Sequence, residues 1–271
     1  MSRFAALALV LCACGPQRAP IDEKVTCTAS DTEVSCAPRI SQVMVNGVGR
    51  DVYWQEPTSD APTAGRPLVI VFQGSWFGPT STWGTVKTDL AFGGFHQARL
   101  QVMLLEHGFT VLAPSAVAGV AWQTNLVGVS WDSSTDKPMM AALLQDIRDG
   151  KYGPVDTSRL YATGISSGGY MTSRMAASEA GTFRALAIQS GSWCTCAGVA
   201  CVLPDTLPAD HPPTRFLHGR TDAVVPIGTA ETYLQKLSDQ GTEADMIVDE
   251  NTGHAWFADS PARITEWFEG H

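Results

Sequence analysis

Residues 159–178 read RLYATGISSGGYMTSRMAAS, and this stretch decides the fold. Arg159–Thr163 is predicted to be a strand and Ser167–Ser178 a helix, and the pattern G-x-S-x-G joins them. In a strand-to-helix turn, this pattern raises the serine hydroxyl above the edge of a sheet. The glycines are needed because a Cβ atom at either position would collide with the neighbouring strand and helix. We therefore expect an α/β fold in which Ser166 lies on a tight, strained turn.

The segments on either side of this turn alternate between strand-like and helix-like patterns. Pro67–Phe72 is a continuous, largely β-branched apolar run, as expected for a strand buried on both faces. Arg39–Val45 and Asp51–Gln55 flank Asn46-Gly47 and predict an antiparallel hairpin at the edge of the sheet. Further strands are expected at 109–113, 184–189, 214–217 and 244–248, and helices at 97–107, 139–148, 227–240 and 261–269. This alternation predicts a mostly parallel central sheet with helices on both faces and an antiparallel N-terminal hairpin.

A serine on such a turn becomes a good nucleophile only when a base accepts its proton. With this motif, the catalytic residues follow the order serine, acid, histidine along the chain. His254 follows the last predicted strand and is the expected base, and Asp222 follows the strand before it and is the expected orienting acid. The weaker rivals lie before the motif, in other loops, at the terminus or too near the base: His96, His107, His211, His218, His271, Asp205, Asp210 and Glu250. His218 is expected to pack near the site or to support it.

Two backbone N–H groups are expected to stabilise the oxyanion that forms when the serine attacks a carbonyl. One belongs to Ser167, directly after the nucleophile, and the other to Ser75, in the loop after the first buried strand. Ser167 also rivals Ser166 as nucleophile, but it lacks a glycine two residues before it. Of the eight tryptophans in the chain, Trp76 and Trp256 are the candidates for contact with substrate.

The N-terminal residues predict export from the cytoplasm. Residues 1–14 carry one arginine and a short apolar run, which suits a signal peptide and is too short for a membrane-spanning helix. Residues 11–14 resemble a bacterial lipobox with Cys14 as the lipidated residue, and an ordinary signal peptide cleaved between residues 15 and 19 is the alternative. We expect residues 15–38 to form a tether with a small disulfide loop, and residues 39–271 to form the catalytic domain.

The remaining cysteines fit an oxidising compartment. Cys27 and Cys36 bracket a short polar segment and are expected to form a disulfide. Two of Cys194, Cys196 and Cys201 are expected to form a second bridge, and the sequence leaves open which two. Three cysteines without a nearby partner histidine make a poor zinc site, so no metal and no other cofactor is expected.

Composition bounds the partners of the protein. The chain has 271 residues and a net charge of −9, which disfavours nucleic acid and an electrostatic attachment to anionic lipid. The expected partner is an ester substrate, with membrane attachment only through a lipidated cysteine. The oligomeric state is not predicted.

Several segments together resemble the extracellular polyhydroxyalkanoate depolymerase, feruloyl esterase and acetylxylan esterase family of α/β-hydrolases. The matching segments are residues 67–75, 156–171, 183–191, 218–226 and 253–256, in the order that this family has. The resemblance implies a secreted serine ester hydrolase with Ser166, Asp222 and His254 as the triad. It implies polyhydroxyalkanoate-type or short-chain hydroxy-acid esters as substrates, with feruloyl or acetylxylan esters as the alternative.

Two features depart from that family. Its oxyanion loop usually reads His-Gly-Cys, whereas this chain has Gln73-Gly74-Ser75, which keeps the backbone donor and changes a neighbouring side chain. The chain also lacks a recognisable C-terminal polymer-binding module, which weakens the case for a crystalline polymer. A small serine peptidase and a non-catalytic binding protein of the same fold remain as further alternatives.

Overall fold

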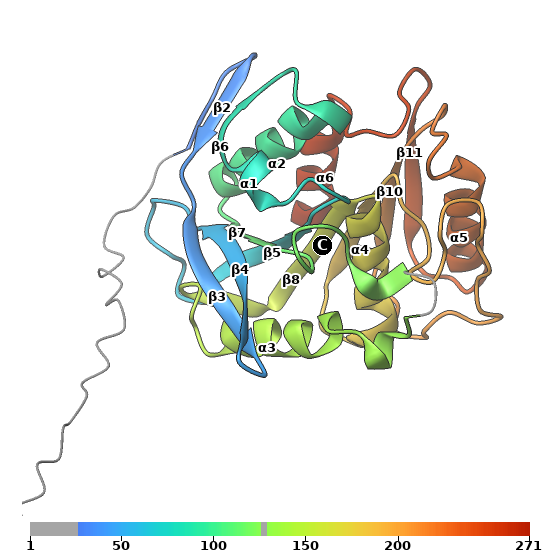
Figure 1. Cartoon of the computed structure of the whole chain (residues 1–271), viewed down its shortest axis with the longest axis horizontal. Coiled ribbons are helices and arrows are strands. Elements are labelled where there is room, and N and C mark those ends of the chain that lie inside the picture. Colours follow the sequence, from blue (N-terminus) through green and yellow to red (C-terminus); the bar gives the residue numbers. More distant parts are fainter. Residues whose placement is uncertain (1–26, 126–128) are drawn as a thin grey trace, which may run out of the picture.

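The computed structural model describes residues 27–125 and 129–271. Its centre is an eight-stranded sheet with the strand order β11-β10-β9-β8-β5-β7-β4-β3 (Figure 1). The strands are β3 (Arg39–Val45), β4 (Val48–Gln55), β5 (Arg66–Phe72), β7 (Thr110–Pro114), β8 (Val155–Ile165), β9 (Ala185–Gln189), β10 (Thr214–Gly219) and β11 (Ala244–Asp249).

The six strands from β7 to β11 in this order run parallel to one another. β4 pairs antiparallel with β7, and β3 pairs antiparallel with β4 to complete the hairpin. The predicted hairpin is confirmed, because Val45 pairs with Val48 across Asn46-Gly47, both of which have positive φ. In a parallel array, all the carboxyl ends lie along one edge of the sheet. The loops after β5, β8, β10 and β11 therefore meet there, although they are far apart in the chain.

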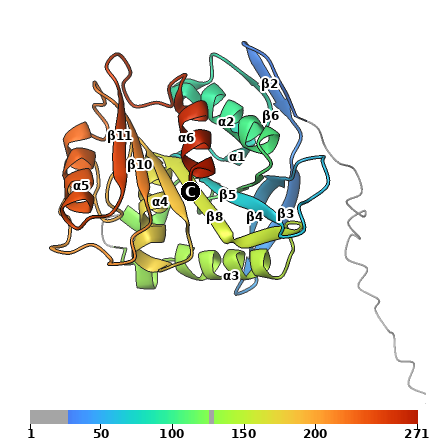
Figure 2. The ribbon, with the colours of Figure 1, turned by 180° about the vertical axis from the view of Figure 1, so that it is seen from behind.

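Helices cover both faces of the sheet, as the alternation predicted. One face carries α2 (Gly94–Glu106) and α6 (Ser260–Glu269), whose buried residues share an apolar core with the sheet. The other face carries α3 (Asp136–Arg148) and α4 (Ser167–Ser178), with α5 (Ile227–Asp239) packed beside β10 and β11. In Figure 2, which views the molecule from the opposite side to Figure 1, α6 lies in front of the sheet. Figure 1 shows α3 below the sheet. The fold is the α/β-hydrolase fold.

The segment before the hairpin differs from the expected tether. The strands β1 (Thr28–Ala29), β2 (Glu33–Cys36) and β6 (Gly84–Lys87) form a small antiparallel sheet, and a short helix, α1 (Pro79–Thr82), precedes β6. Val34 and Val86 are buried in the same core as α2. The last part of residues 15–38 is therefore packed against the domain and does not form a tether. A polar loop was expected because the pairing partner of β2 lies about fifty residues further along the chain.

The cysteines form two bridges among the described residues. Cys27–Cys36 is present as predicted, and the second bridge joins Cys196 to Cys201. Cys194 is the free thiol; it is buried, and burial raises its pKa to about 12. A thiol that stays protonated is a poor nucleophile and metal ligand, so the structure gives Cys194 a packing role.

The predicted signal peptide, the lipobox and Cys14 lie outside the described residues. Within residues 27–125 and 129–271, no helix is long and apolar enough to span a bilayer.

Candidate active site

Ser166 lies on the turn between β8 and α4 in a backbone conformation that non-glycine residues rarely adopt. Its φ is +57° and its ψ is −120°. Two backbone hydrogen bonds hold it there, from the Ser166 N–H to the Gln189 carbonyl (3.1 Å) and from the Tyr170 N–H to the Ser166 carbonyl (3.0 Å). Strain of this kind persists only where the surroundings over-determine it, and it is the conformation expected of a nucleophile elbow.

The glycines around Ser166 are needed for close packing. A Cβ atom on Gly164 would lie 2.6 Å from the carbonyl oxygens of Phe72 and Gly168. A Cβ atom on Gly168 would lie 2.1 Å from the Phe72 oxygen, and that oxygen belongs to a central strand that cannot move aside. The motif therefore specifies a close approach of the turn to the end of β5.

His254 and Asp222 meet at the same edge of the sheet, from the loops after β11 and β10. The His254 Nδ1 atom lies 2.8 Å from Asp222 Oδ2. An ionised carboxylate only accepts, so Nδ1 carries the ring proton and Nε2 is left with a lone pair. The aspartate's other oxygen, Oδ1, accepts from the backbone N–H groups of Val224 (2.9 Å) and Val225 (2.8 Å).

A second histidine, His218, also contacts Asp222. Its Nε2 atom lies 2.8 Å from the Val225 carbonyl oxygen and 3.5 Å from Asp222 Oδ2. A carbonyl only accepts, so Nε2 carries the proton and also points it toward the carboxylate. Burial alone would raise the pKa of Asp222, but hydrogen bonds from His218, His254 and the Val225 N–H outweigh burial and hold it well below its usual range.

Gln189, at the end of β9, connects the serine turn to the histidine loop. Its backbone carbonyl accepts from Ser166, while its side-chain Nε2 donates to the carbonyl of Ala255 at 2.8 Å. Its Oε1 accepts from the Ser260 hydroxyl at 2.8 Å. One buried residue thus sets the position of His254 relative to Ser166, and no local pattern signalled it.

The two residues expected to supply oxyanion donors both lie close to Ser166: Ser75 lines the same cavity, and Ser167 follows Ser166 in the chain. Ser167 begins α4, where the first N–H groups of a helix lack helical acceptors and the dipole favours negative charge. Ser75 follows Gly74, whose backbone approaches Ile165 and Ser166 so closely that an added Cβ atom would lie 3.1 Å from Ile165 Cγ2. The loop is anchored by Gln73, which donates to the Gly119 carbonyl (3.0 Å) and accepts from the Ala116 N–H (3.0 Å).

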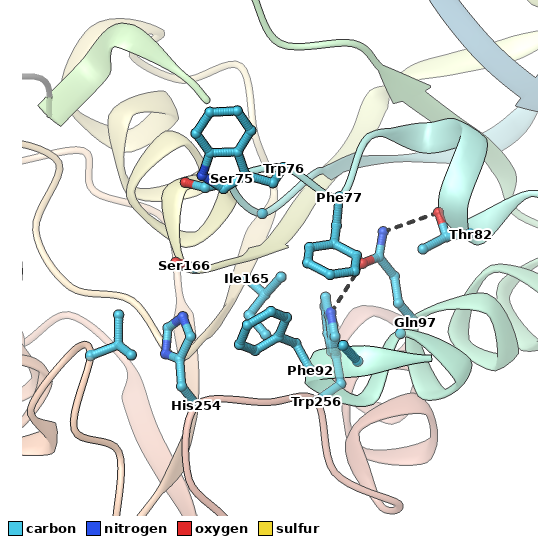
Figure 3. A pocket seen from close by; sticks show the side chains of 14 residues that line it. Ser75, Trp76, Phe77, Thr82, Phe92, Gln97, Ile165, Ser166, His254 and Trp256 are labelled. Carbon is cyan, nitrogen blue, oxygen red and sulfur yellow. Dashed lines mark hydrogen bonds between the residues drawn. The ribbon is translucent and has the colours of Figure 1, made fainter. Parts of the chain in front are cut away.

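A cavity of about 210 Å³ opens beside Ser166 and His254. Its walls are mainly apolar. Figure 3 shows the side chains of four wall residues between Ser166 and His254 on one side and Gln97 and Thr82 on the other: Phe77, Phe92, Ile165 and Trp256. Three of its lining residues expose large apolar side chains to solvent: Trp76 (74% exposed), Val224 (56%) and Phe92 (49%).

Trp76 and Trp256 both line this cavity, in different ways. Trp76 is exposed and has a φ of +68°, whereas Trp256 is 2% exposed and forms part of the wall. The other tryptophans do not line it. Phe92 was not predicted; it also has a positive φ (+56°), and its ring lies 6.1 Å from that of His254. It comes from the segment before α2, which only the tertiary structure brings to the site.

The rival residues lie elsewhere or have other partners. His211 is buried against the hydroxyl of Tyr233 (2.5 Å), and burial lowers the pKa of His211 to about 4. Glu250 is exposed and accepts a hydrogen bond from Arg220. Among the described residues, no group of three or more His, Cys, Asp and Glu side chains is arranged to hold a metal ion.

The fold and this site define the class of the protein, which is a serine ester hydrolase of the α/β-hydrolase type. Residues 53–267 match the dienelactone hydrolase family, so the chain belongs to the dienelactone hydrolase family. It is also 46% identical over 242 residues to a poly(3-hydroxyoctanoate) depolymerase of Pseudomonas fluorescens, covering 88% of this chain and 86% of that protein. Within that family the chain is polyhydroxyalkanoate depolymerase-like, as its sequence motifs implied.

Solved structures share the fold at low identity. A dienelactone hydrolase described as putative, from Klebsiella pneumoniae, superposes with a TM-score of 0.54 at 21% identity, covering 86% of this chain and 98% of that chain. The esterase PE8 gives a TM-score of 0.57 at 21% identity, covering 80% and 96%. The butyrate-bound esterase 2 of Thermogutta terrifontis gives 0.57 at 15%, covering 86% and 92%.

Proposed function

We propose that the protein hydrolyses aliphatic hydroxy-acid polyesters and their oligomers through an acyl-enzyme on Ser166, with His254 as base and Asp222 as orienting acid. One observation carries the proposal. His254, which is joined to Asp222 at 2.8 Å, and the strained Ser166 line the same apolar cavity.

In the proposed reaction, His254 Nε2 accepts the Ser166 proton as the hydroxyl oxygen attacks the ester carbonyl. The backbone N–H groups of Ser75 and Ser167 donate to the oxyanion, each lowering the barrier by about 3 kcal/mol. The protonated His254 gives its proton to the departing alcohol, and the acyl group stays on Ser166. Water, activated by His254, then releases the acid by the reverse path.

The substrate class is supported by the cavity and by the depolymerase to which the chain is similar. At roughly 30 Å³ for each water-sized group, 210 Å³ accommodates about seven of them, enough for one unbranched acyl chain. The exposed apolar residues Trp76, Phe92 and Val224, which line the cavity, suit an amorphous, uncharged polymer.

The test compares wild type, Ser166→Ala and Ser167→Ala on five substrates: p-nitrophenyl octanoate, a feruloyl ester, acetylated xylan, a peptide anilide and a poly(3-hydroxyoctanoate) suspension. Wild type should hydrolyse the octanoate and clear the suspension. Ser166→Ala should lose at least 10⁴-fold in kcat/KM, whereas Ser167→Ala keeps its backbone donor and should lose less than about tenfold. Activity of Ser166→Ala near that of wild type would refute the mechanism, and a preference for the peptide or xylan would refute the substrate class.

We further propose that the protein works outside the cytoplasm, with a lipid on Cys14 and a catalytic domain made of residues 39–271 together with β2, which packs in the same core. The Cys27–Cys36 and Cys196–Cys201 disulfides support an oxidising compartment. Cell fractionation of wild type and Cys14→Ser is the test. Cytoplasmic retention of the wild type would contradict export, and an unchanged distribution of the variant would contradict lipidation.

A further inference from the structure

The inner end of the cavity is polar, although its walls are apolar. Gln97, on α2, and Thr82, at the end of α1, both line the cavity and are 3% and 1% exposed. Figure 3 shows them at the end away from Ser166 and His254, with the rings of Phe77, Phe92 and Trp256 in between. The proposed reaction takes place at the other end and does not use them.

The orientation of the Gln97 amide is determined by its neighbours. The indole Nε1–H of Trp256 can only donate, and it donates to Gln97 Oε1 at 3.1 Å. The amide nitrogen Nε2 must therefore face the other way, where it donates to Thr82 Oγ1 over a long 3.5 Å. An amide nitrogen carries two N–H groups, so this one long bond leaves Gln97, a residue that lines the cavity, with donor capacity that the bond to Thr82 does not use.

Buried donors of this kind discriminate between chains that enter the cavity. A plain alkyl chain would displace water from the Gln97 amide and offer it no acceptor, which is unfavourable. A chain that carries a carbonyl oxygen at this depth would pair with the amide. Sites built to hydrogen-bond a substrate group discriminate strongly against analogues that lack the group.

We propose that Gln97 and Thr82 form a subsite that binds a second ester carbonyl oxygen, further along the acyl chain than the carbonyl attacked by Ser166. This inference rests on the proposed esterase function and sharpens its substrate to hydroxy-acid oligoesters over plain fatty-acid esters. In such polyesters only a few bonds separate consecutive carbonyls. A cavity with room for about seven water-sized groups therefore accommodates the next ester group.

The test uses p-nitrophenyl octanoate and a series of oxo-octanoates in which one carbonyl is moved along the chain from the middle to the end. The variants are Gln97→Met, which keeps the length of the side chain and removes its donors, and Thr82→Val. Gln101→Met is the matched control. Gln101 lies one turn further along α2, is 1% exposed and donates to the Thr82 carbonyl at 3.0 Å, but does not line the cavity.

The readout is the ratio of kcat/KM for the best oxo ester to that for octanoate, which does not depend on the amount of folded enzyme. In wild type and Gln101→Met, kcat/KM for the best oxo ester should exceed that for octanoate by about tenfold. This is roughly the effect expected of one hydrogen bond to a buried amide. Gln97→Met should reduce the ratio to about one by accepting octanoate better, and Thr82→Val should change it less.

Each outcome decides one of the two proposals. A flat wild-type profile, or the same profile in Gln97→Met, would overturn the subsite and leave the esterase function intact. A purely structural role for Gln97, tying α2 to Trp256, would lower activity on all esters together without changing the ratio, and it would also overturn the subsite. Failure of the wild type to hydrolyse any ester would instead refute the proposed function.

Discussion

Replacing Asp222 with asparagine is expected to reverse the proton arrangement of the proposed triad without disturbing its shape. Asp222 Oδ1 accepts from two backbone N–H groups, those of Val224 and Val225. In the variant, the amide oxygen must stay at that position, because an NH₂ group there would face two donors. The NH₂ group then faces His254 Nδ1, which must become an acceptor.

This change removes the base. With Nδ1 accepting, the neutral His254 ring carries its proton on Nε2 and can no longer take one from Ser166. A wrong tautomer in a triad of this type costs about 10⁴-fold in kcat, or about 5 kcal/mol of barrier. The free energy of unfolding should change far less, because the turn at residues 222–225 keeps both of its backbone hydrogen bonds.

The assay is kcat and KM on p-nitrophenyl octanoate, with urea unfolding as the measure of stability. Asp249→Asn is the matched control, because Asp249 Oδ1 likewise accepts from two backbone N–H groups, those of Asn251 and Thr252, without contacting a histidine. It should stay within about twofold of wild type. If Asp222→Asn kept a tenth of the activity, or if both variants lost activity equally, the assigned role of Asp222 would be wrong.

Three further outcomes are expected. His218→Leu removes the second side-chain donor to the Asp222 carboxylate of the proposed triad and leaves the buried Val225 carbonyl without its partner. We expect kcat/KM to fall about tenfold and the free energy of unfolding to fall by about 1–3 kcal/mol, and an unchanged kcat/KM would contradict this. Gly168→Ala places a Cβ atom 2.1 Å from the Phe72 carbonyl oxygen and should lower the free energy of unfolding in urea by more than about 3 kcal/mol. In Gly74→Ala the new Cβ atom meets a side chain at 3.1 Å, so the free energy of unfolding should fall by only about 1 kcal/mol. Equal losses in the two variants would refute the packing argument. Burial lowers the pKa of His211 from 6.5 to about 4. As the pH falls, the unfolded chain therefore binds a proton at this histidine before the folded chain does. The free energy of unfolding should drop by about 3 kcal/mol between pH 7 and pH 4. His211→Gln should lose this part of the acid sensitivity, and identical pH profiles would exclude the explanation.

The sequence by itself determined the features that depend on neighbouring residues. The strand, elbow and helix around Ser166 follow from apolar runs and glycines within twenty residues, and α4 begins and ends at the predicted residues. The Asn46-Gly47 hairpin is likewise a local preference. The candidates Asp222 and His254 followed from their places after successive strands, because parallel strands bring such loops to one edge.

The tertiary structure alone decided the rest. The pairing of β2 with β6 joins segments that are distant in the chain, and so does the position of Phe92 and Gln97 at the cavity. The second disulfide joins Cys196 to Cys201 rather than to Cys194, although the local sequence treats the three cysteines alike. Local pattern carries no information about such contacts, because their free energy arises only when the core packs and each buried polar group finds its partner.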